Sequence, residues 1–182
     1  MVYAVFTDEM RRLLRSVQGK RLLRYEWAEE PYSRHEAYGN LRLDLEDGAI
    51  EIENLQKPVP VFDIIDDMSC FSCRREKAGT PFAPYCPDPM RSCPVGERVT
   101  AIELVRDEVN VDHGAYEVAF DMALILRLER QVLMLARDVW FSESIAILPH
   151  DDYDRHYPTR KVMESWENEQ YAVTVRRTKI IL

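Results

Sequence analysis

The stretch YEVAFDMALILRLERQVLMLARDVWF, residues 116–141, decides the fold. Every even-numbered position from Tyr116 to Leu128 is apolar, and charged residues occupy several of the odd-numbered positions between them. An apolar residue at every second position indicates a β-strand with one buried face. A second apolar run, Val132 to Ala136, follows the dipeptide Arg130-Gln131. We therefore predict a β-hairpin over residues 116–141.

A two-residue turn at Arg130-Gln131 would place Leu128 opposite Leu133 and keep one apolar face continuous. The other face mixes charged and apolar residues, which predicts that a helix or a partner covers part of it. Arg-Gln is a poor choice for such a turn, and Met, Ala, Leu, Glu and Arg are good helix formers. A helix over residues 121–136 is therefore the alternative.

A second hairpin is predicted within residues 40–54, where Asp47-Gly48 separates two alternating apolar runs. The turn requires positive φ, which Gly adopts without strain. Pro58 and Pro60 then indicate an extended crossing or edge segment. The other strands are predicted at residues 21–27, 69–73, 99–111, 142–148 and 171–182.

Two helices are predicted, one near each end of the chain. Thr7 or Asp8 can cap the first, with Gly19 as its stop signal, and residues 159–170 suit the second. No helix is evident between Tyr25 and Leu148, whereas a parallel sheet needs a helix between successive strands. We therefore predict an α+β, β-rich fold with a mostly antiparallel sheet of about eight strands. The pattern does not distinguish a sandwich from a half-open barrel.

The length of 182 residues favours a single domain over residues 1–182, with a long Pro-rich irregular segment at about 78–96. A net charge of -8, with only short basic clusters, argues against a nucleic-acid partner. Asp8 and Glu9 interrupt any apolar signal region, and the apolar runs are too short to span a membrane. A cytoplasmic protein with no membrane partner is the expectation.

The glycines are all isolated, so the sequence has no phosphate-binding Gly-rich loop, and it has no Gly-x-Ser-x-Gly or His-Glu-x-x-His motif. The four cysteines are instead gathered in one segment, at Cys70, Cys73, Cys86 and Cys93. Four thiolates can hold a tetrahedral Zn²⁺, and Cys-x-x-Cys is the usual half of such a site. A metal would also help the Pro-rich segment to keep its shape.

Two features argue against this zinc site. Six residues separate Cys86 from Cys93, more than is usual for a zinc pair. In a strand, Cys70 and Cys73 would also point to opposite faces. Buried or loop thiols, a disulfide and a redox pair are the alternatives, and no other cofactor is expected.

Residues 150–156 form a second polar cluster, with His150 and His156 at its ends and three aspartates between them. Imidazoles and carboxylates can bind a divalent metal or act as a general base. A contiguous polar run after a strand is also typical of a solvated loop.

Aromatic residues gather near the first predicted strand, at Tyr25, Trp27, Tyr32 and Tyr38. They could line a groove for a sugar or a peptide, or they could be core positions. Trp140 and Phe141 would point to opposite faces of a strand, so one of them is expected in a second packing layer or an exposed contact.

Two classes of function follow. The first is a non-enzymatic β-rich accessory or protein-interaction module, which includes a homodimer through a sheet edge or the Trp140 face. The second is an enzyme, or a small-ligand or metal-binding protein, with its site between the Cys/Pro-rich loop and residues 150–156. That site would bring Cys86 or Cys93 toward His150 or His156 across a cleft. The lack of a catalytic motif favours the first class.

Overall fold

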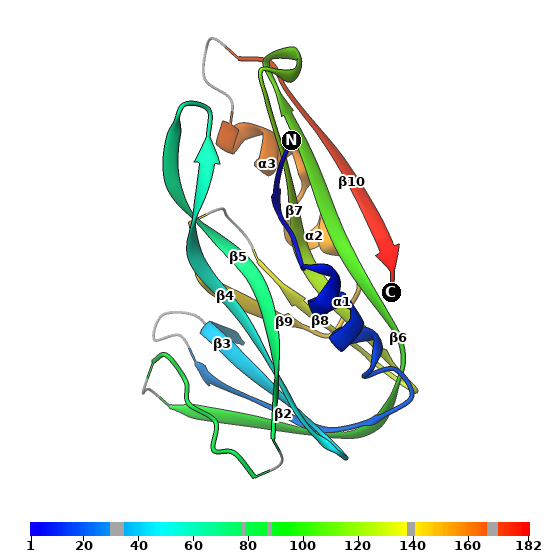
Figure 1. The fold of residues 1–182 in the computed structure, drawn as a ribbon. Helices are drawn as coiled ribbons and strands as arrows, with labels where there is room; N and C mark the ends of the chain where they lie inside the picture. Colours follow the sequence, from blue (N-terminus) through cyan, green and yellow to red (C-terminus); the bar gives the residue numbers. More distant parts are fainter. Residues whose placement is uncertain (30–34, 78, 87–88, 138–140, 167–170) are drawn as a thin grey trace.

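The computed structural model describes residues 1–29, 35–77, 79–86, 89–137, 141–166 and 171–182. The described residues form ten strands and a few short helices (Figure 1). The strands are β1 (Val2–Ala4), β2 (Arg21–Glu29), β3 (Glu36–Leu45), β4 (Gly48–Val61), β5 (Ile64–Glu76), β6 (Met90–Val111), β7 (Tyr116–Leu128), β8 (Val132–Ala136), β9 (Ser144–Leu148) and β10 (Val173–Ile181). The helices are α1 (Asp8–Arg15), the 3-10 turn η1 (Asp112–Gly114), α2 (Tyr153–His156) and α3 (Thr159–Trp166).

All ten strands belong to one sheet, and the pairings are antiparallel except for the parallel pair β1–β7. The mostly antiparallel, β-rich fold is therefore confirmed, with ten strands rather than about eight. Six strands pair in a closed ring, in the order β2-β6-β7-β8-β9-β3 and back to β2. The ring replaces both the half-open form and the two-sheet sandwich that the strand pattern left open. The β4–β5 hairpin extends from β3, and β10 extends from β6.

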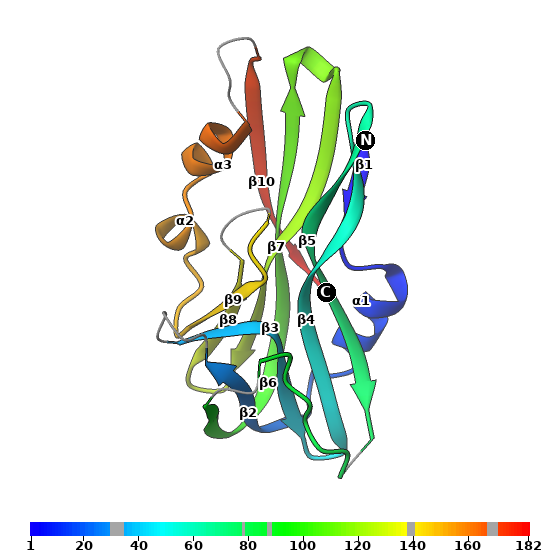
Figure 2. The same ribbon diagram turned by 90° about the vertical axis from the view of Figure 1, so that its left-hand side faces the viewer.

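The ring closes because β6 is 22 residues long and pairs with two different ring strands along its length. Its first part, from Met90 to Arg98, pairs with β2. Its second part, from Val99 to Val111, pairs with β7, and β10 lies on the other side of this part. Figures 1 and 2 both show β6 and β7 as long neighbouring strands that run through most of the molecule.

The central hairpin is confirmed as β7–β8, and the helix over residues 121–136 is wrong. The register differs from the expected one, because Leu133 pairs with Leu126 rather than with Leu128. The backbone N–H of Leu128 instead donates to the carbonyl of Gln131 within the turn, at 2.9 Å. The longer turn avoids the strained two-residue Arg-Gln turn. A shift of two residues keeps leucine facing leucine from Leu124 to Leu128, which belong to the first core cluster. The expected continuous face is wrong, however, because the β6–β7 register shifts near Met122 and the even-numbered residues from Tyr116 to Met122 belong to the second cluster.

β7 is buried on both faces, which the alternation did not predict. Asp121, on the face expected to be polar, is fully buried. Its carboxylate accepts the backbone N–H of Phe6 at 2.8 Å and pairs with the Arg106 guanidinium at 2.8 Å. The segment after β1 therefore covers this face at Asp121, where a helix or a partner was predicted. The buried charge is tolerated because it is both paired and hydrogen-bonded.

The hairpin within residues 40–54 is confirmed as β3–β4, with a shifted turn. Leu45 pairs with Gly48, so Glu46 and Asp47 form the turn and Gly48 (φ 144°) begins β4. β4 continues through Pro58 and Pro60 and pairs with β5 as far as Val61, where Phe62-Asp63 forms a further turn. The prolines fit because β4 pairs with β3 only up to Glu53. Beyond that residue, a missing N–H can face the unpaired edge.

The irregular segment is shorter than the predicted 78–96, because Met90 already begins β6. Pro94 lies where the β2–β6 register shifts, between the pairs Leu22–Glu97 and Arg24–Pro94. Such an irregularity accommodates a residue that has no N–H to donate.

The predicted terminal helices are confirmed in type. Thr7 caps α1 by accepting the Met10 N–H through its side-chain oxygen at 3.3 Å, and α3 begins at Thr159 as expected. The polar run 150–156 contains the short helix α2, which was not expected. In the part of the chain that the structure describes, no helix is both long and apolar enough to cross a membrane.

The apolar core has two clusters. One includes Leu43 and Leu126 of the ring strands, residues of β4 and β5, and Leu14 of α1. The other includes Phe120 of β7 and Val162 of α3. Figure 2 shows α2 and α3 on one side of the long strands and α1 on the other. α1 thus contributes to the first core, and α2 and α3 contribute to the second.

Leu124→Ala is expected to lower the free energy of unfolding by about 2–5 kcal/mol, because Leu124 is fully buried in the first core cluster. Leu23→Ala makes the same change at an exposed position of β2 and should cost about 0.5 kcal/mol or less. Urea unfolding followed by circular dichroism measures both. Equal losses in the two variants would contradict the core assignment.

Candidate functional site

A pocket of about 550 Å³ lies at one end of the ring, and its walls come from most of the ring strands and from α2. Aliphatic residues of β6, of the β7–β8 hairpin and of β9 form much of its lining. Its lining includes Tyr25, Trp27, Val95, Leu133, Ile147 and His156. We refer to it as the ring pocket. It therefore exists only when the ring strands are paired as a closed ring.

One wall of the ring pocket is aromatic. Tyr25 and Trp27 lie on the same face of β2 because they are two residues apart, and their rings stack at 5.4 Å between centroids. Burial and the adjacent Cys93, which the Tyr25 hydroxyl contacts, raise the pKa of Tyr25, so the phenol stays protonated. The indole N–H of Trp27 is buried and has no hydrogen-bond partner among the described residues. This wall therefore offers two stacked aromatic rings to the pocket.

The pocket lining also contains a few polar side chains, from His35, Glu36, Gln131 and His156. Gln131 is held in place, since its side-chain amide donates to Glu97 at 3.3 Å. His156 belongs to α2, where its ring lies 6.0 Å from that of Tyr153. A mainly apolar cavity with a small number of polar groups is the usual composition of a small-molecule site.

The structure brings together one of the predicted Cys–His pairs. Cys93 of β6 and His156 of α2 both line the ring pocket, whereas Cys86 and His150 are not among its lining residues. Cys93 and His156 therefore line one cavity, and a Cys–His site between the two segments stays a prediction. The two residues approach this cavity from different elements and share its wall.

The four cysteines do not gather. Cys70 and Cys73 lie on β5 but belong to different core clusters, because residues three apart in a strand point to opposite faces. Cys86 lies in the Pro-rich segment and Cys93 in β6, and none of the four is in a disulfide. Among the described residues, no group of three or more His, Cys, Asp or Glu side chains is arranged to hold a metal ion. The geometry gives the zinc prediction no support.

The carboxylates of residues 150–156 have structural partners. Asp151 accepts from Arg127 at 2.7 Å, which holds the pKa of Asp151 below its ordinary value. Asp152 caps α2 by accepting the Arg155 N–H at 3.1 Å. Asp154 pairs with Arg177 at 2.8 Å. These contacts fasten α2 to β7 and β10, so the acidic run positions His156 rather than forming a site of its own.

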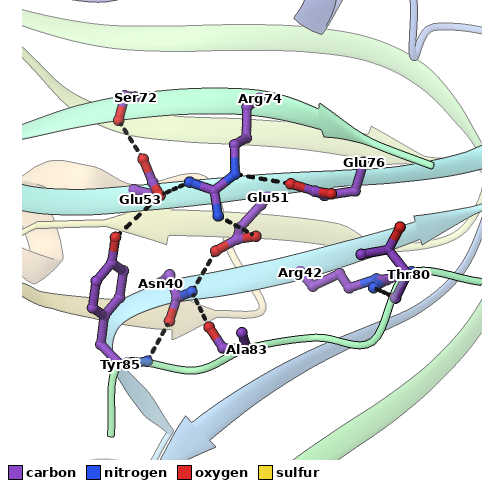
Figure 3. Close-up of polar contacts among 10 residues, drawn as sticks. All are labelled: Asn40, Arg42, Glu51, Glu53, Ser72, Arg74, Glu76, Thr80, Ala83 and Tyr85. Carbon is purple, nitrogen blue, oxygen red and sulfur yellow. Dashed lines mark hydrogen bonds and ion pairs between the residues drawn. The ribbon is translucent and has the colours of Figure 1, made fainter.

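A polar network lies on β3, β4 and β5 beneath the Pro-rich segment (Figure 3). Arg74 is at its centre, 2.9 Å from both Glu51 and Glu76 and also paired with Glu53. Ser72 donates to Glu53 at 3.0 Å. The hydrogen bond to Glu76 and the nearby carboxylates raise the pKa of Arg74, so it remains charged among these acids.

The same network anchors the Pro-rich segment by its backbone. The buried Asn40 side chain donates to the Ala83 carbonyl at 3.0 Å and accepts the Tyr85 N–H at 3.1 Å. Arg42 donates to the Thr80 carbonyl. Figure 3 shows these side chains reaching from β3 to the segment. They hold its shape, which is the role that a metal was expected to fill, and they satisfy polar groups that would otherwise be costly to bury.

Two of the four aromatic residues, Tyr25 and Trp27, fit both alternatives, because they pack in the first core cluster and also face the pocket. Tyr25 and Trp27 line the ring pocket, Tyr38 is exposed and donates to Glu143 at 2.7 Å, and Tyr32 lies outside the described residues. Phe141 is exposed, and its predicted counterpart Trp140 also lies outside the described residues.

Sequence reasoning missed most of the pocket lining. Leu133 and Ile147 read as ordinary core positions, and only the ring topology shows that a cavity separates them from β2. It also missed the network, because Asn40 and Arg42 read as the solvent face of a hairpin. The available signal was the opposite charge of residues on neighbouring strands. Arg42 lies on one strand, and Glu51 and Glu53 lie on the next.

No protein-family model matches the chain, and neither the curated proteins nor the solved structures include one with significant similarity to it.

At about pH 8, we expect Cys93 and Cys86 to react with an alkylating reagent before Cys70 and Cys73. Burial, with Glu53 nearby, raises the pKa of Cys73 to about 12, and burial also raises that of Cys70. The reactive thiolate is therefore scarce at both buried sites until the protein unfolds. Timed alkylation and mass spectrometry, with and without urea, measure the order. Four cysteines that were protected together and released together by a chelator would instead indicate a shared zinc site.

Proposed function

We propose that the protein is a non-enzymatic binding protein that takes a small, mainly apolar ligand into the ring pocket. The observation that carries this proposal is the pocket itself, with its volume of about 550 Å³ and its stacked Tyr25–Trp27 wall. Small-molecule sites typically have volumes of about 300–1,000 Å³, apolar and aromatic walls and a few polar groups that orient the ligand. The ring pocket agrees with each of these features.

The walls also suggest the shape of the ligand. Tyr25 and Trp27 present ring faces, and Leu133 and Ile147 are aliphatic. A planar or aromatic body would stack on the first pair and be covered by the second. His156 and Gln131 would then meet a polar end. Burial of such a body removes apolar surface from water. The free energy gained, about 25 cal/mol per Å² of buried apolar surface, is the main source of affinity.

Binding is favoured over catalysis by the arrangement of the polar residues. Nucleophilic chemistry needs a thiol and a base within hydrogen-bond reach, with a third group to orient the base. Cys93 contacts Tyr25, and the neighbouring aspartates are engaged in ion pairs and a helix cap. The ligand function ranks first because a formed cavity supports it. A homodimer through a sheet edge or the Trp140 face stays a prediction.

The test uses N-phenyl-1-naphthylamine, a small apolar aromatic probe whose fluorescence rises in dry surroundings. Wild-type protein should bind the probe saturably, at one site per chain. The bound probe should quench the fluorescence emission of Trp27. Val95→Trp adds bulk to the pocket lining and should weaken binding about tenfold or more, equivalent to about 1.4 kcal/mol. Fluorescence titration measures the dissociation constants.

Two variants make this test specific. Val175→Trp makes the same change at a half-buried valine of β10 away from the pocket, and its affinity should match that of wild type. Trp27→Phe should remove the quenching and retain binding, since an aromatic face remains. The proposal fails if wild-type protein does not bind saturably, or if folded Val95→Trp binds as well as wild type.

A further inference from the structure

A second cavity, of about 450 Å³, shares Trp27 and His35 with the ring pocket. Its other lining residues are Glu29, Arg91 and Ser92, so most of its wall is charged or polar. We refer to it as the polar cavity. An apolar and a polar cavity with two lining residues in common can receive the two ends of one ligand.

The strand register places the polar cavity on the same face of the sheet as the ring pocket. Trp27 of β2 pairs with Arg91 of β6, and directly opposed residues share a face. Cys93 of the ring pocket lies two residues from Arg91, about 7 Å away at the usual rise of a strand and on the same face. Glu29 lies opposite Ala37, which is buried with Trp27 in the first core cluster. Arg91 and Glu29 therefore continue the aromatic wall of the ring pocket.

Arg91 has hydrogen-bond donors that its ion pair does not use. Its Nε and Nη2 atoms both lie 2.7 Å from Oε2 of Glu29. A guanidinium carries five N–H donors, and within the described part of the chain Arg91 has no second acceptor. Its side chain is half exposed, so a ligand can reach it. Unused guanidinium donors in a planar fork suit an incoming carboxylate.

Glu29 has little capacity left for a cationic ligand. Its Oε2 atom accepts from Arg91, and its Oε1 atom accepts the backbone N–H of His35 at 3.5 Å. The hydrogen bond from Arg91 holds the pKa of Glu29 below its ordinary value, so the pair stays ionised. The described residues that line the ring pocket include no lysine or arginine. A negative group therefore finds its counter-charge only in the polar cavity.

We propose that the ligand of the ring pocket is an amphipathic carboxylic acid. This inference rests on the ligand function and names the class of ligand. The apolar body lies against Tyr25 and Trp27, and the carboxylate accepts from the Arg91 guanidinium beside His35. Because Arg91 lies beyond the aromatic wall, several carbons separate the apolar body from the carboxylate. A carboxylate carries a single charge and so repels the neighbouring Glu29 less than a phosphate dianion would.

The probes are phenylhexanoate, phenylhexanol and phenylhexylamine, which share one apolar body and differ in the charge of the terminal group. Each is titrated against N-phenyl-1-naphthylamine bound to the full chain, and the loss of dye fluorescence gives its affinity. Wild-type protein should bind phenylhexanoate about tenfold more tightly than phenylhexanol, since hydrogen bonds to a charged group are the stronger ones. Phenylhexylamine should bind least tightly. Arg91→Gln should remove the preference for phenylhexanoate.

Glu29→Gln separates a ligand contact from a structural role of the ion pair. Loss of the Glu29 charge frees Arg91, so phenylhexanoate should bind several-fold more tightly, whereas a purely structural pair would weaken all three probes in both variants. Arg176→Gln is the matched control, because Arg176 is an exposed arginine that pairs with Glu108 away from both cavities. Its affinities should equal those of wild type. Circular dichroism confirms that each variant is folded.

Three results would each overturn the acid ligand: equal binding of the three probes, tightest binding of phenylhexylamine, or an unchanged preference for phenylhexanoate in folded Arg91→Gln. The ligand function survives these results, because the probes still displace the dye from the ring pocket. If the dye itself shows no saturable binding, the ligand function fails and the acid ligand fails with it.

Discussion

The pairing of β6 with two different neighbours is the constraint on which the rest of the structure depends. Met90 to Arg98 of β6 holds β2, and Val99 to Val111 holds β7, so a single strand joins the two ends of the ring. Without the first pairing, β3 would still hold β2 to β9, but the ring would be open between β2 and β6. The ring pocket exists because this strand brings the Tyr25–Trp27 wall opposite the β7–β8 hairpin and β9. The same strand carries β10, which supports α2 through Arg177 and Asp154.

Local pattern predicted the strands well and their neighbours poorly, for physical reasons. Apolar alternation in β7 identifies buried residues, and the leucines from Leu124 to Leu128 keep their face despite a register error of two residues. The register shift near Met122, which places the earlier even-numbered residues in the other core cluster, left no signal in the alternation. The turn chemistry was less exact, since Asp47-Gly48 marked the right hairpin but Glu46 and Asp47 form its turn. The burial of Asp121 could not be predicted, because its partners Phe6 and Arg106 are distant in sequence. Closure of the ring is likewise a long-range property.

For the candidate site too, local features were predictable and long-range arrangement was not. Tyr25 and Trp27 were recognisable from their spacing, and His156 from its polar surroundings, but no motif links them. Cys-x-x-Cys suggested a zinc site by spacing alone, and the strand geometry of β5 separates its two thiols. The shape of the Pro-rich segment comes from side chains such as Asn40 that read as solvent-facing residues of a hairpin. Sites built from several strand ends leave little trace in a single sequence.

Ring closure also determines when the pocket can form during folding. Arg21 of β2 pairs with Arg98 of β6, so the chain between them must form a large loop before this contact is made. The β3–β4 and β4–β5 hairpins close over short loops and can form early. The β2–β6 pairing is therefore expected late, and the ring pocket appears only with it. The Tyr25–Trp27 wall then reports on complete folding, since partly folded chains would hold their hairpins but no cavity.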